Sequence, residues 1–180
     1  MKRVVNRAIV LNILMLSLLL GMFSCGGNST SQLIGVWKTS DLSSGLGTEI
    51  FRNMRADGRF TDEMHINIIQ ETEGPDMLAR FVVLLDGTWS VRGKILTTEY
   101  DFTSGELKSF DYSFPDAPED ELDYYLEEYS YFEGYMQTEG LKVMLDNMPK
   151  GKQRFIRLNI KDNQFSYYTQ EGSEVWTRVK

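Results

Sequence analysis

The sequence predicts a mainly β protein: an eight-stranded antiparallel up-and-down β-barrel with a helical insertion between its fifth and sixth strands. Three observations lead to this fold class. Short stretches of alternating apolar and polar residues recur along the chain, separated by turns rich in Gly, Asn and Asp. Every second connection is tight whereas most of the others are long, so the tight turns would gather at one barrel end. The β pattern stops once, in residues 103–149, where apolar residues take helical spacing.

The first residues of the chain predict export. Residues 1–24 join the basic Lys2, Arg3 and Arg7 to a long apolar run, which is typical of a signal peptide. The residues before Cys25 resemble a bacterial lipoprotein signal, and this resemblance implies that Cys25 is lipidated. Acyl chains would hold the protein at a membrane without a spanning helix. An ordinary secretory leader and an uncleaved anchor are the alternatives.

The remainder of the chain predicts one globular domain on a tether. Residues 25–31 are rich in Gly and Ser and are expected to be flexible, and residues 32–180 are expected to form the barrel. The net charge of −7 becomes about −10 once the basic leader is set aside. So acidic a domain is expected to repel nucleic acid and anionic membrane surfaces.

The first three strands are predicted at residues 33–39, 48–55 and 59–70. The loop between the first two, residues 40–47, is rich in Ser and Gly, and a three-residue turn with Gly58 joins the second to the third. A slip of one residue would exchange the two faces of this hairpin, so its apolar face fixes the register. The expected opposite pairs are Met54 with Phe60, Arg52 with Asp62, and Ile50 with Met64.

Five further strands are predicted after the loop at residues 71–77. Residues 78–91 and 94–102 are joined by a tight turn at Arg92 and Gly93, residues 153–161 and 164–169 by a turn at Asp162 and Asn163, and residues 175–179 close the barrel. The expected pairs are Trp89 with Leu96, Leu85 with Tyr100, Ile160 with Phe165, and Leu158 with Tyr167.

The insertion at residues 103–149 predicts two helices. Leu122, Tyr125, Leu126 and Tyr129 recur at helical spacing after Pro118, and a second helix is expected over residues 135–148. These helices could form a lid over the barrel mouth or pack on the outer residues Val82 and Leu84. Alternatively, their acidic and aromatic surface could dock another protein.

Three short motifs resemble the lipocalin-like superfamily and its small bacterial lipoprotein members. They are Gly35-Val36-Trp37, Gly87-Thr88-Trp89 and Thr177-Arg178-Val179. The resemblance implies a lipocalin-like barrel in which Trp37 stacks against Arg178 at the closed end. The helical insertion departs from the usual plan of the superfamily, so no ligand position is carried over from it.

Candidate ligand contacts follow from strand parity. Arg52 and Asp62 are predicted inside the barrel, as a polar anchor for a ligand or as a pair that satisfies itself. Phe81, Tyr100, Phe102 and Tyr167 are predicted on the inner face toward the mouth. They could line an apolar cavity, or the barrel could be filled by its own side chains.

The sequence holds no pattern that favours an enzyme. His65, the single histidine, is expected on the polar face of its strand, which leaves no Ser/His/Asp or Cys/His arrangement. The acidic run Glu119, Asp120 and Glu121, with Asp123 and the glutamates that follow, is expected to be a solvated helix face, with weak calcium binding as the minor alternative. We therefore expect no catalytic residues, cofactor or metal.

Together these observations predict a lipid-anchored lipoprotein of the outer membrane that faces the periplasm. Its barrel is expected to bind a small apolar or amphipathic molecule, gated by the insertion. The alternative is a filled barrel that presents its acidic helices to another envelope protein. A cavity reached from the loop end would distinguish the two.

Overall fold

The computed structural model describes residues 27–41, 47–170 and 172–179. The expected signal peptide, Cys25 and most of the first loop lie outside these residues. No helix of the described part is long and apolar enough to cross a membrane. The strands are β1 (Gly35–Asp41), β2 (Gly47–Met54), β3 (Arg59–Gln70), β4 (Met77–Arg92), β5 (Ile95–Tyr100), β6 (Glu106–Ser113), β7 (Gln153–Lys161), β8 (Gln164–Tyr168) and β9 (Ser173–Arg178). The helices are α2 (Gly27–Leu33), η1 (Phe102–Ser104), α3 (Leu122–Glu128), α4 (Tyr131–Tyr135), η2 (Met136–Gly140) and α5 (Leu141–Asn147).

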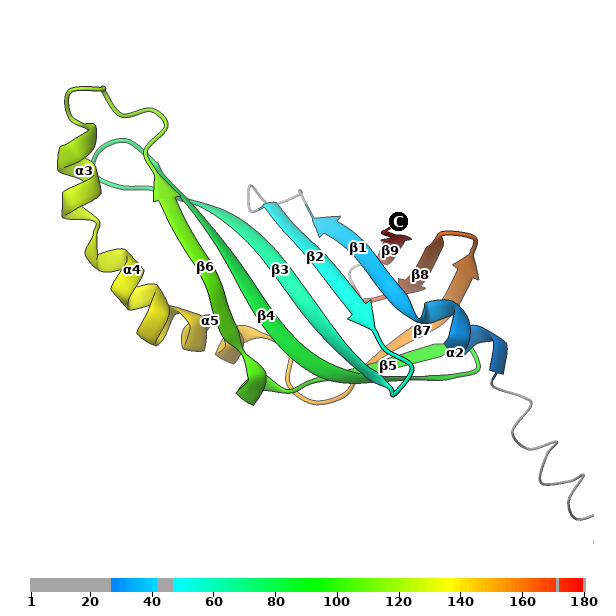
Figure 1. The fold of residues 1–180 in the computed structure, drawn as a ribbon. Coiled ribbons are helices and arrows are strands. Elements are labelled where there is room, and N and C mark those ends of the chain that lie inside the picture. The colour runs from blue at the N-terminus through cyan, green and yellow to red at the C-terminus, as the bar shows by residue number, and fades with distance from the viewer. Residues whose placement is uncertain (1–26, 42–46, 171, 180) are drawn as a thin grey trace, which may run out of the picture.

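Eight of these strands close into an antiparallel β-barrel (Figure 1). Around the barrel they follow the order β1, β2, β3, β4, β5, β7, β8, β9, and β9 pairs back onto β1. The expected eight-stranded antiparallel barrel is therefore confirmed. The additional strand, β6, pairs with β4 outside the closed ring.

The expectation that residues 103–149 are a helical insertion is wrong in its first part. β4 is 16 residues long, and β5 pairs with its last third only. After the short turn η1 the chain continues as β6 along the first part of β4. Residues 106–113 alternate weakly in polarity, so their sequence does not mark them as a strand, and β4 supplies the partner that makes them one. The helices α3, α4 and α5 follow between β6 and β7.

The predicted register of the first hairpin is correct, and that of the second is wrong by two residues. Ile50, Arg52 and Met54 pair with Met64, Asp62 and Phe60 as expected. In the second hairpin, however, Trp89 pairs with Thr98 and Gly87 with Tyr100. The reason is the turn, in which Gly93 takes the first central position with φ +61° and Lys94 the second. A shift of two residues keeps each side chain on its expected face.

The third hairpin contains a β-bulge. Ile160 pairs with Phe165 as predicted, but Leu158 is not a ladder partner of Tyr167, because the register shifts between Ile156 and Asn159. Arg157 has φ +57° within the bulge. The amide of Leu158 instead donates to the carbonyl of Lys94, 3.0 Å away, which ties β7 to the turn between β4 and β5.

One barrel end, called the closed end below, carries the three tight turns, which lie at residues 55–58, 93–94 and 162–163. The tether was expected to be flexible, but from Gly27 onward it is helical and forms α2. α2 lies across this end, where it contacts β4 and β7. Arg178 fastens α2 by donating from its guanidinium to the carbonyls of Gln32 and Ile34. Gly35, at φ +132°, leaves room for this guanidinium, since a Cβ there would lie 2.5 Å from its Nη1.

The lower part of the barrel is packed with large side chains. This cluster joins α2 to all eight strands of the barrel and includes three tryptophan rings. Its fully or nearly fully buried members are Leu33, Trp37, Met54, Phe60, Trp89, Leu96, Leu158, Phe165, Tyr167 and Trp176. The closed end is therefore a solid core rather than an entrance.

The helices cover the inner face of the sheet where β3 and β4 extend beyond the closed ring. We call residues 131–147, comprising α4, η2 and α5, the cover helix. Its Met136 and Leu145 are buried in one cluster with Met64, Phe81 and Val83. These three strand residues share the parity of Asp62 and Leu85, so the covered face is the one that lines the barrel interior. Figure 1 shows α3 at the far end of β4 and β6, with α4 and α5 running from there back toward the barrel.

The helices were expected to form a lid over the barrel mouth, to pack on Val82 and Leu84, or to dock another protein. Their observed position over the inner face corresponds to the lid. α3 packs beyond the cover helix in a third cluster with Met77, Ala79 and Phe114. Its partly buried residues include Leu122, Tyr125, Leu126 and Tyr129, the four that the sequence places on one helical face.

Candidate functional site

Inside the barrel, Arg52, Asp62 and Tyr100 form a closed hydrogen-bond network. The Nε and Nη2 atoms of Arg52 donate to the two carboxylate oxygens of Asp62, each at 2.7 Å. Nη2 also donates to the hydroxyl of Tyr100 at 2.8 Å, and that hydroxyl donates to Asp62 at 2.7 Å. The side chain of Arg52 is 4% exposed and that of Asp62 is 0% exposed. Adjacent strands position the pair, because Arg52 on β2 lies opposite Asp62 on β3.

Aromatic rings enclose this ion pair. The guanidinium carbon of Arg52 lies 4.4 Å from the ring centroid of Phe60 and 4.7 Å from that of Trp176. Burial alone would lower the pKa of Arg52, but the charge of Asp62 and the phenol of Tyr100 raise it above its ordinary value. Burial also raises the pKa of Tyr100. Arg52 therefore stays charged and Tyr100 stays a neutral donor.

The network is complete without a ligand. Among the described residues, no buried side-chain nitrogen or oxygen lacks a hydrogen-bond partner. Of the two interpretations of Arg52 and Asp62, this favours a pair that satisfies itself near the barrel floor. A ligand that used Arg52 as its anchor would have to displace a bidentate carboxylate, which is an unfavourable exchange.

Tyr167 and Glu174 continue the polar interior from the far side of the barrel. They pair across β8 and β9, and the Tyr167 hydroxyl accepts a 3.1 Å hydrogen bond from the indole of Trp176. Burial raises the pKa of Glu174, whereas the hydrogen bond from Tyr167 and the charge of Arg52 lower it. Burial raises the pKa of Tyr167 as well. Glu174 is thus a half-buried carboxyl group on the inner face.

The expected aromatic lining is divided between the ring and the covered face. Tyr100 contacts both Phe60 in the floor, at 5.3 Å between ring centroids, and Phe102, at 6.0 Å. Phe102 lies in η1, not in the fifth strand, and the ammonium of Lys150 sits 3.8 Å from its ring centroid. Phe81 lies farther out, beneath the cover helix. The structure therefore brings Arg52, Asp62 and Tyr100 together with Tyr167 nearby, and leaves Phe81 and Phe102 toward the helices.

At the closed end the structure brings Trp37 and Arg178 together. The guanidinium carbon of Arg178 lies 4.2 Å from the Trp37 ring centroid. The Trp37 indole donates to the carbonyl of Leu33 at 2.6 Å and meets Phe165 edge to face at 4.7 Å. This contact closes the floor and joins α2 to β1 and β9, the first and last strands of the chain.

His65 lies on the outer face of β3. Its Nε2 is 2.8 Å from Glu63, which also accepts from Lys108 at 2.9 Å. The hydrogen bond from Lys108, followed by that from His65, lowers the pKa of Glu63. Within the described residues, no three His, Cys, Asp or Glu side chains are placed to hold a metal ion.

The sequence reasoning missed Glu174 and Trp176 as parts of the interior. The signal was present, since Glu174, Trp176 and Arg178 alternate along β9 and Arg178 was expected to stack against Trp37 at the closed end. Glu174 was missed because the last strand was predicted to begin at Val175, whereas β9 begins at Ser173. Leu145 and Met136 of the cover helix were also missed, because helical spacing alone does not say which surface a helix covers.

Hollows also occur at the helical end and along the cover helix. One of about 530 Å³ is lined by Glu73, Gly74, Tyr124, Tyr125, Glu128 and Tyr129. A second, of about 430 Å³, lies between the loop after β3 and Phe132. A third, of about 270 Å³, lies between Phe102 and the residues Thr138, Leu141, Lys142, Leu145 and Asp146. The third marks the seam between the cover helix and the barrel mouth.

Comparisons with known proteins identify no family. No protein-family model matches the chain, and no curated protein matches it. Among solved structures, an uncharacterized protein from Bacteroides eggerthii DSM 20697 is similar at 12% sequence identity with a TM-score of 0.37. The match covers 81% of this chain and 98% of that one. A likeness at this level transfers neither fold nor function.

Proposed function

We propose that this protein is a lipid-anchored lipoprotein whose lipocalin-like barrel binds a small apolar or amphipathic molecule beneath the cover helix. In this proposal Cys25 carries the acyl chains, and the domain faces the periplasm from the outer membrane. The protein acts by binding rather than by catalysis. The Trp37–Arg178 contact and the solid floor fit the resemblance to the lipocalin-like superfamily.

One observation carries the proposal: the apolar inner face continues from the barrel to beneath the cover helix. Ile50 and Tyr100 touch both the floor cluster and the covered cluster, so the two are contiguous. In a barrel without the extension of β3 and β4, the apolar inner face would stop at the rim of the barrel. Here a helix rather than a strand lies over Met64, Phe81 and Val83, and moving it would expose an apolar trough lined by aromatic rings.

The cover helix is irregular in its middle and held to the barrel at its C-terminal end. Its middle, η2, is a π-helical segment, a geometry that is rare and often found at functional sites. Two contacts fasten the helix at the seam: Leu145 packs on Gly105, and the ammonium of Lys150 lies 3.8 Å from the Phe102 ring centroid. Lys150 also caps the end of α5 by donating to the Leu145 carbonyl at 2.6 Å. The hollow beside Phe102 opens at this same seam.

A disulfide across the seam tests the proposal. An ideal Cβ on Gly105 would lie 2.4 Å from a terminal carbon of Leu145, so cysteines at both positions face each other. We expect the oxidised Gly105→Cys/Leu145→Cys protein, prepared as residues 26–180, to bind N-phenyl-1-naphthylamine about tenfold more weakly or worse, because the open state is depleted. Fluorescence titration before and after reduction measures this.

The two single-cysteine variants are the matched controls and should bind equally with and without reductant. Restoration of binding by reductant in the double variant alone supports the proposal. Equal affinity of the oxidised and reduced double variant would contradict it, as would a protein that binds no probe in either state.

A second function, a protein-interaction module, is favoured by one observation. The helices expose aromatic side chains among many carboxylates: Tyr124 is 61% exposed, Tyr131 65% and Tyr135 42%. Exposed tyrosines are enriched at protein interfaces. In that case the cover helix stays closed, the barrel acts as a rigid support, and the disulfide leaves partner binding unchanged.

A further inference from the structure

Basic side chains gather at the closed end of the barrel. Hydrogen bonds knit the turns there into one surface: the Trp89 amide donates to the Gly58 carbonyl and the Arg178 amide to the Asn163 carbonyl, both at 2.7 Å. The basic residues of this surface are Arg55, Arg59, Arg92, Lys94, Lys161 and Arg178, and the acidic ones in the same turns are Asp57 and Asp162. We call this surface the basic floor.

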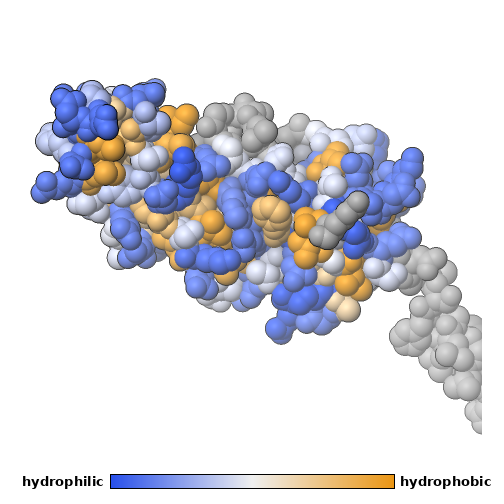
Figure 2. Space-filling model, turned by 45° about the horizontal axis from the view of Figure 1, so that its top comes forward, coloured by the Kyte–Doolittle hydropathy of each residue, from blue (hydrophilic) through white to orange (hydrophobic). Residues whose placement is uncertain are grey.

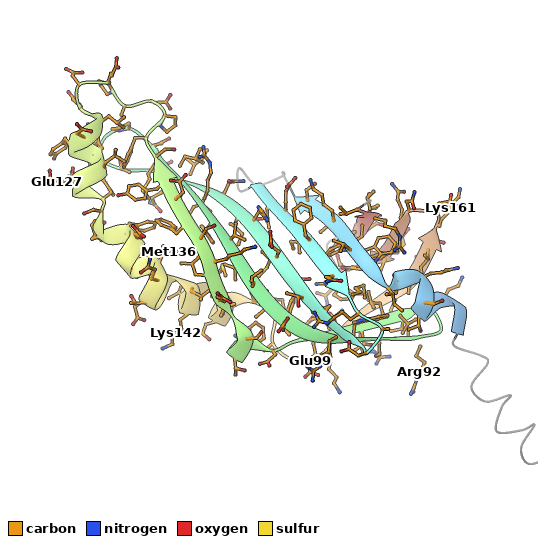
Figure 3. The ribbon with its side chains drawn as sticks, viewed as in Figure 1. Arg92, Glu99, Glu127, Met136, Lys142 and Lys161 are labelled. Atoms are coloured by element: carbon orange, nitrogen blue, oxygen red, sulfur yellow. The ribbon has the colours of Figure 1, made fainter. Side chains whose placement is uncertain are left out.

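The opposite end of the molecule is strongly acidic. The loop after β3, the loop after β6 and α3 carry carboxylates with few basic residues between them. These are Glu71, Glu73, Asp76, Asp116, Glu119, Asp120, Glu121, Asp123, Glu127 and Glu128. In Figure 3, Arg92 and Lys161 lie at the end that bears α2, and Glu127 lies at the far end. The net charge of the chain does not reveal that its basic and acidic residues are concentrated at opposite ends.

Most of the basic floor is not engaged within the protein. Arg59, Arg92, Lys94 and Lys161 are exposed. None of them takes part in an ion pair among the described residues, whose ion pairs all involve other basic side chains. Apolar side chains accompany them: Ile34 is 36% exposed, Val36 37% and Val179 40%. Figure 2 shows hydrophobic residues at the surface among hydrophilic ones at this end.

The chain also brings the expected anchor to the basic floor. α2 begins at Gly27 and lies across the closed end. Cys25 precedes it by two residues, a path of at most about 7 Å. Such a path is shorter than the Debye length of about 8 Å at physiological ionic strength. An acyl group on Cys25 would therefore hold the start of α2 close to the lipid headgroups. Arg178 joins this helix to the basic floor through its hydrogen bonds to the carbonyls of Gln32 and Ile34.

We propose that the basic floor docks on the anionic headgroups of the membrane that holds the anchor, so that the helical end points away from the bilayer. The proposal rests on the proposed lipidation of Cys25. It differs from the expectation that the domain repels anionic membranes, which follows from the net charge alone. The acidic end is repelled and the basic floor attracted, and both forces favour the same orientation. The seam beside Phe102 then remains accessible from solution.

The expected effect follows from the number of free cations. Each Lys or Arg close to an anionic surface strengthens attachment about fivefold. Reversing three of them should therefore shift the balance between docked and undocked orientations by about a hundredfold or more. Added salt should weaken docking in the same direction.

Energy transfer to the bilayer measures the orientation of the full-length lipidated protein. A donor dye is attached at Ala56→Cys on the floor or at Gly134→Cys on α4, and the acceptor is a headgroup-labelled lipid. In nanodiscs that contain phosphatidylglycerol, we expect high transfer from Ala56→Cys and low transfer from Gly134→Cys. The short anchor keeps the closed end near the bilayer in every case, so the triple variant Arg92→Glu/Lys94→Glu/Lys161→Glu should narrow this difference rather than abolish it, as should the parent protein in phosphatidylcholine nanodiscs.

The matched control reverses three basic residues elsewhere, in Arg80→Glu/Lys108→Glu/Lys142→Glu, and should keep the parent's transfer. Circular dichroism checks that both variants are folded. Equal transfer from the two dyes in both lipids, or an unchanged floor variant, would overturn the docking proposal. The intact mass of the purified protein separates this outcome from failure of the anchor, because a missing acyl mass overturns lipidation and, with it, the docking that rests on it.

Discussion

Asp62→Ala is expected to lower the free energy of unfolding by about 3–5 kcal/mol, because it leaves the guanidinium of Arg52 buried without its carboxylate. Arg52 would keep only the Tyr100 hydroxyl and the surrounding rings, which do not replace a bidentate ion pair. Urea unfolding at neutral pH, followed by far-ultraviolet circular dichroism, measures the change.

Two controls make this result specific. The triple variant Arg52→Met/Asp62→Leu/Tyr100→Phe removes both charges and the hydroxyl that bonds to them. It should recover most of the lost stability, since an apolar set of similar volume is tolerated where an ion pair was buried. Asp111→Ala breaks the exposed pair with Arg80, 3.4 Å long, and should cost less than about 1 kcal/mol. If Asp62→Ala were as mild as Asp111→Ala, the buried network would not hold the barrel as described.

Trp37→Ala is expected to cost about 3–5 kcal/mol, the usual range for removing a large buried aromatic side chain. Trp37 is 0% exposed and touches α2, Phe165 and Arg178 at once. Its loss should loosen α2 from the closed end as well as open a cavity. Thermal unfolding gives the stability, and hydrogen exchange of residues 27–33 reports the loosening.

Tyr131→Ala is the comparison, because Tyr131 is 65% exposed and its truncation should change stability by less than about 0.5 kcal/mol. A Trp37→Ala protein as stable as Tyr131→Ala would mean that the closed end is not the packed floor described above.

The strand register could be predicted from the sequence where any other register would bury polar side chains or expose apolar ones. In the β2–β3 hairpin, only one alignment places Met54 and Phe60 together and sets Arg52 against Asp62. The β4–β5 hairpin was less constrained. Moving its turn by one position keeps each residue on its face, so apolar patterning could not locate the glycine of the turn.

Other features depend on tertiary partners that the local sequence does not name. β6 is a strand because the long β4 offers it an edge, and α2 is a helix because the closed end offers it Trp37 and Arg178. The bulge at Arg157 likewise follows from the bond between Leu158 and Lys94. For the site, the sequence found Arg52, Asp62, Tyr100 and Tyr167 but not the direction in which the helices would fold.

The binding proposal depends on the cover helix being separable from the face it covers. That face is continuous with the barrel core through Ile50 and Tyr100, so any ligand there would contact both. The cover helix is fastened to the barrel mouth chiefly by apolar side chains and by the contact of Lys150 with Phe102 at the seam. The ligand-bound and ligand-free proteins would then differ in the position of the cover helix, whereas the barrel would be the same in both.

Native mass spectrometry of the protein purified from its own host tests this account most directly. We expect a species heavier than the lipidated chain by the mass of one small molecule. Collisional activation should release this molecule from the protein. The Gly105→Cys/Leu145→Cys variant, oxidised while free of ligand and then mixed with it, should show no added mass. A lipidated chain that always carries no added mass, under conditions that keep the barrel folded, would contradict the account.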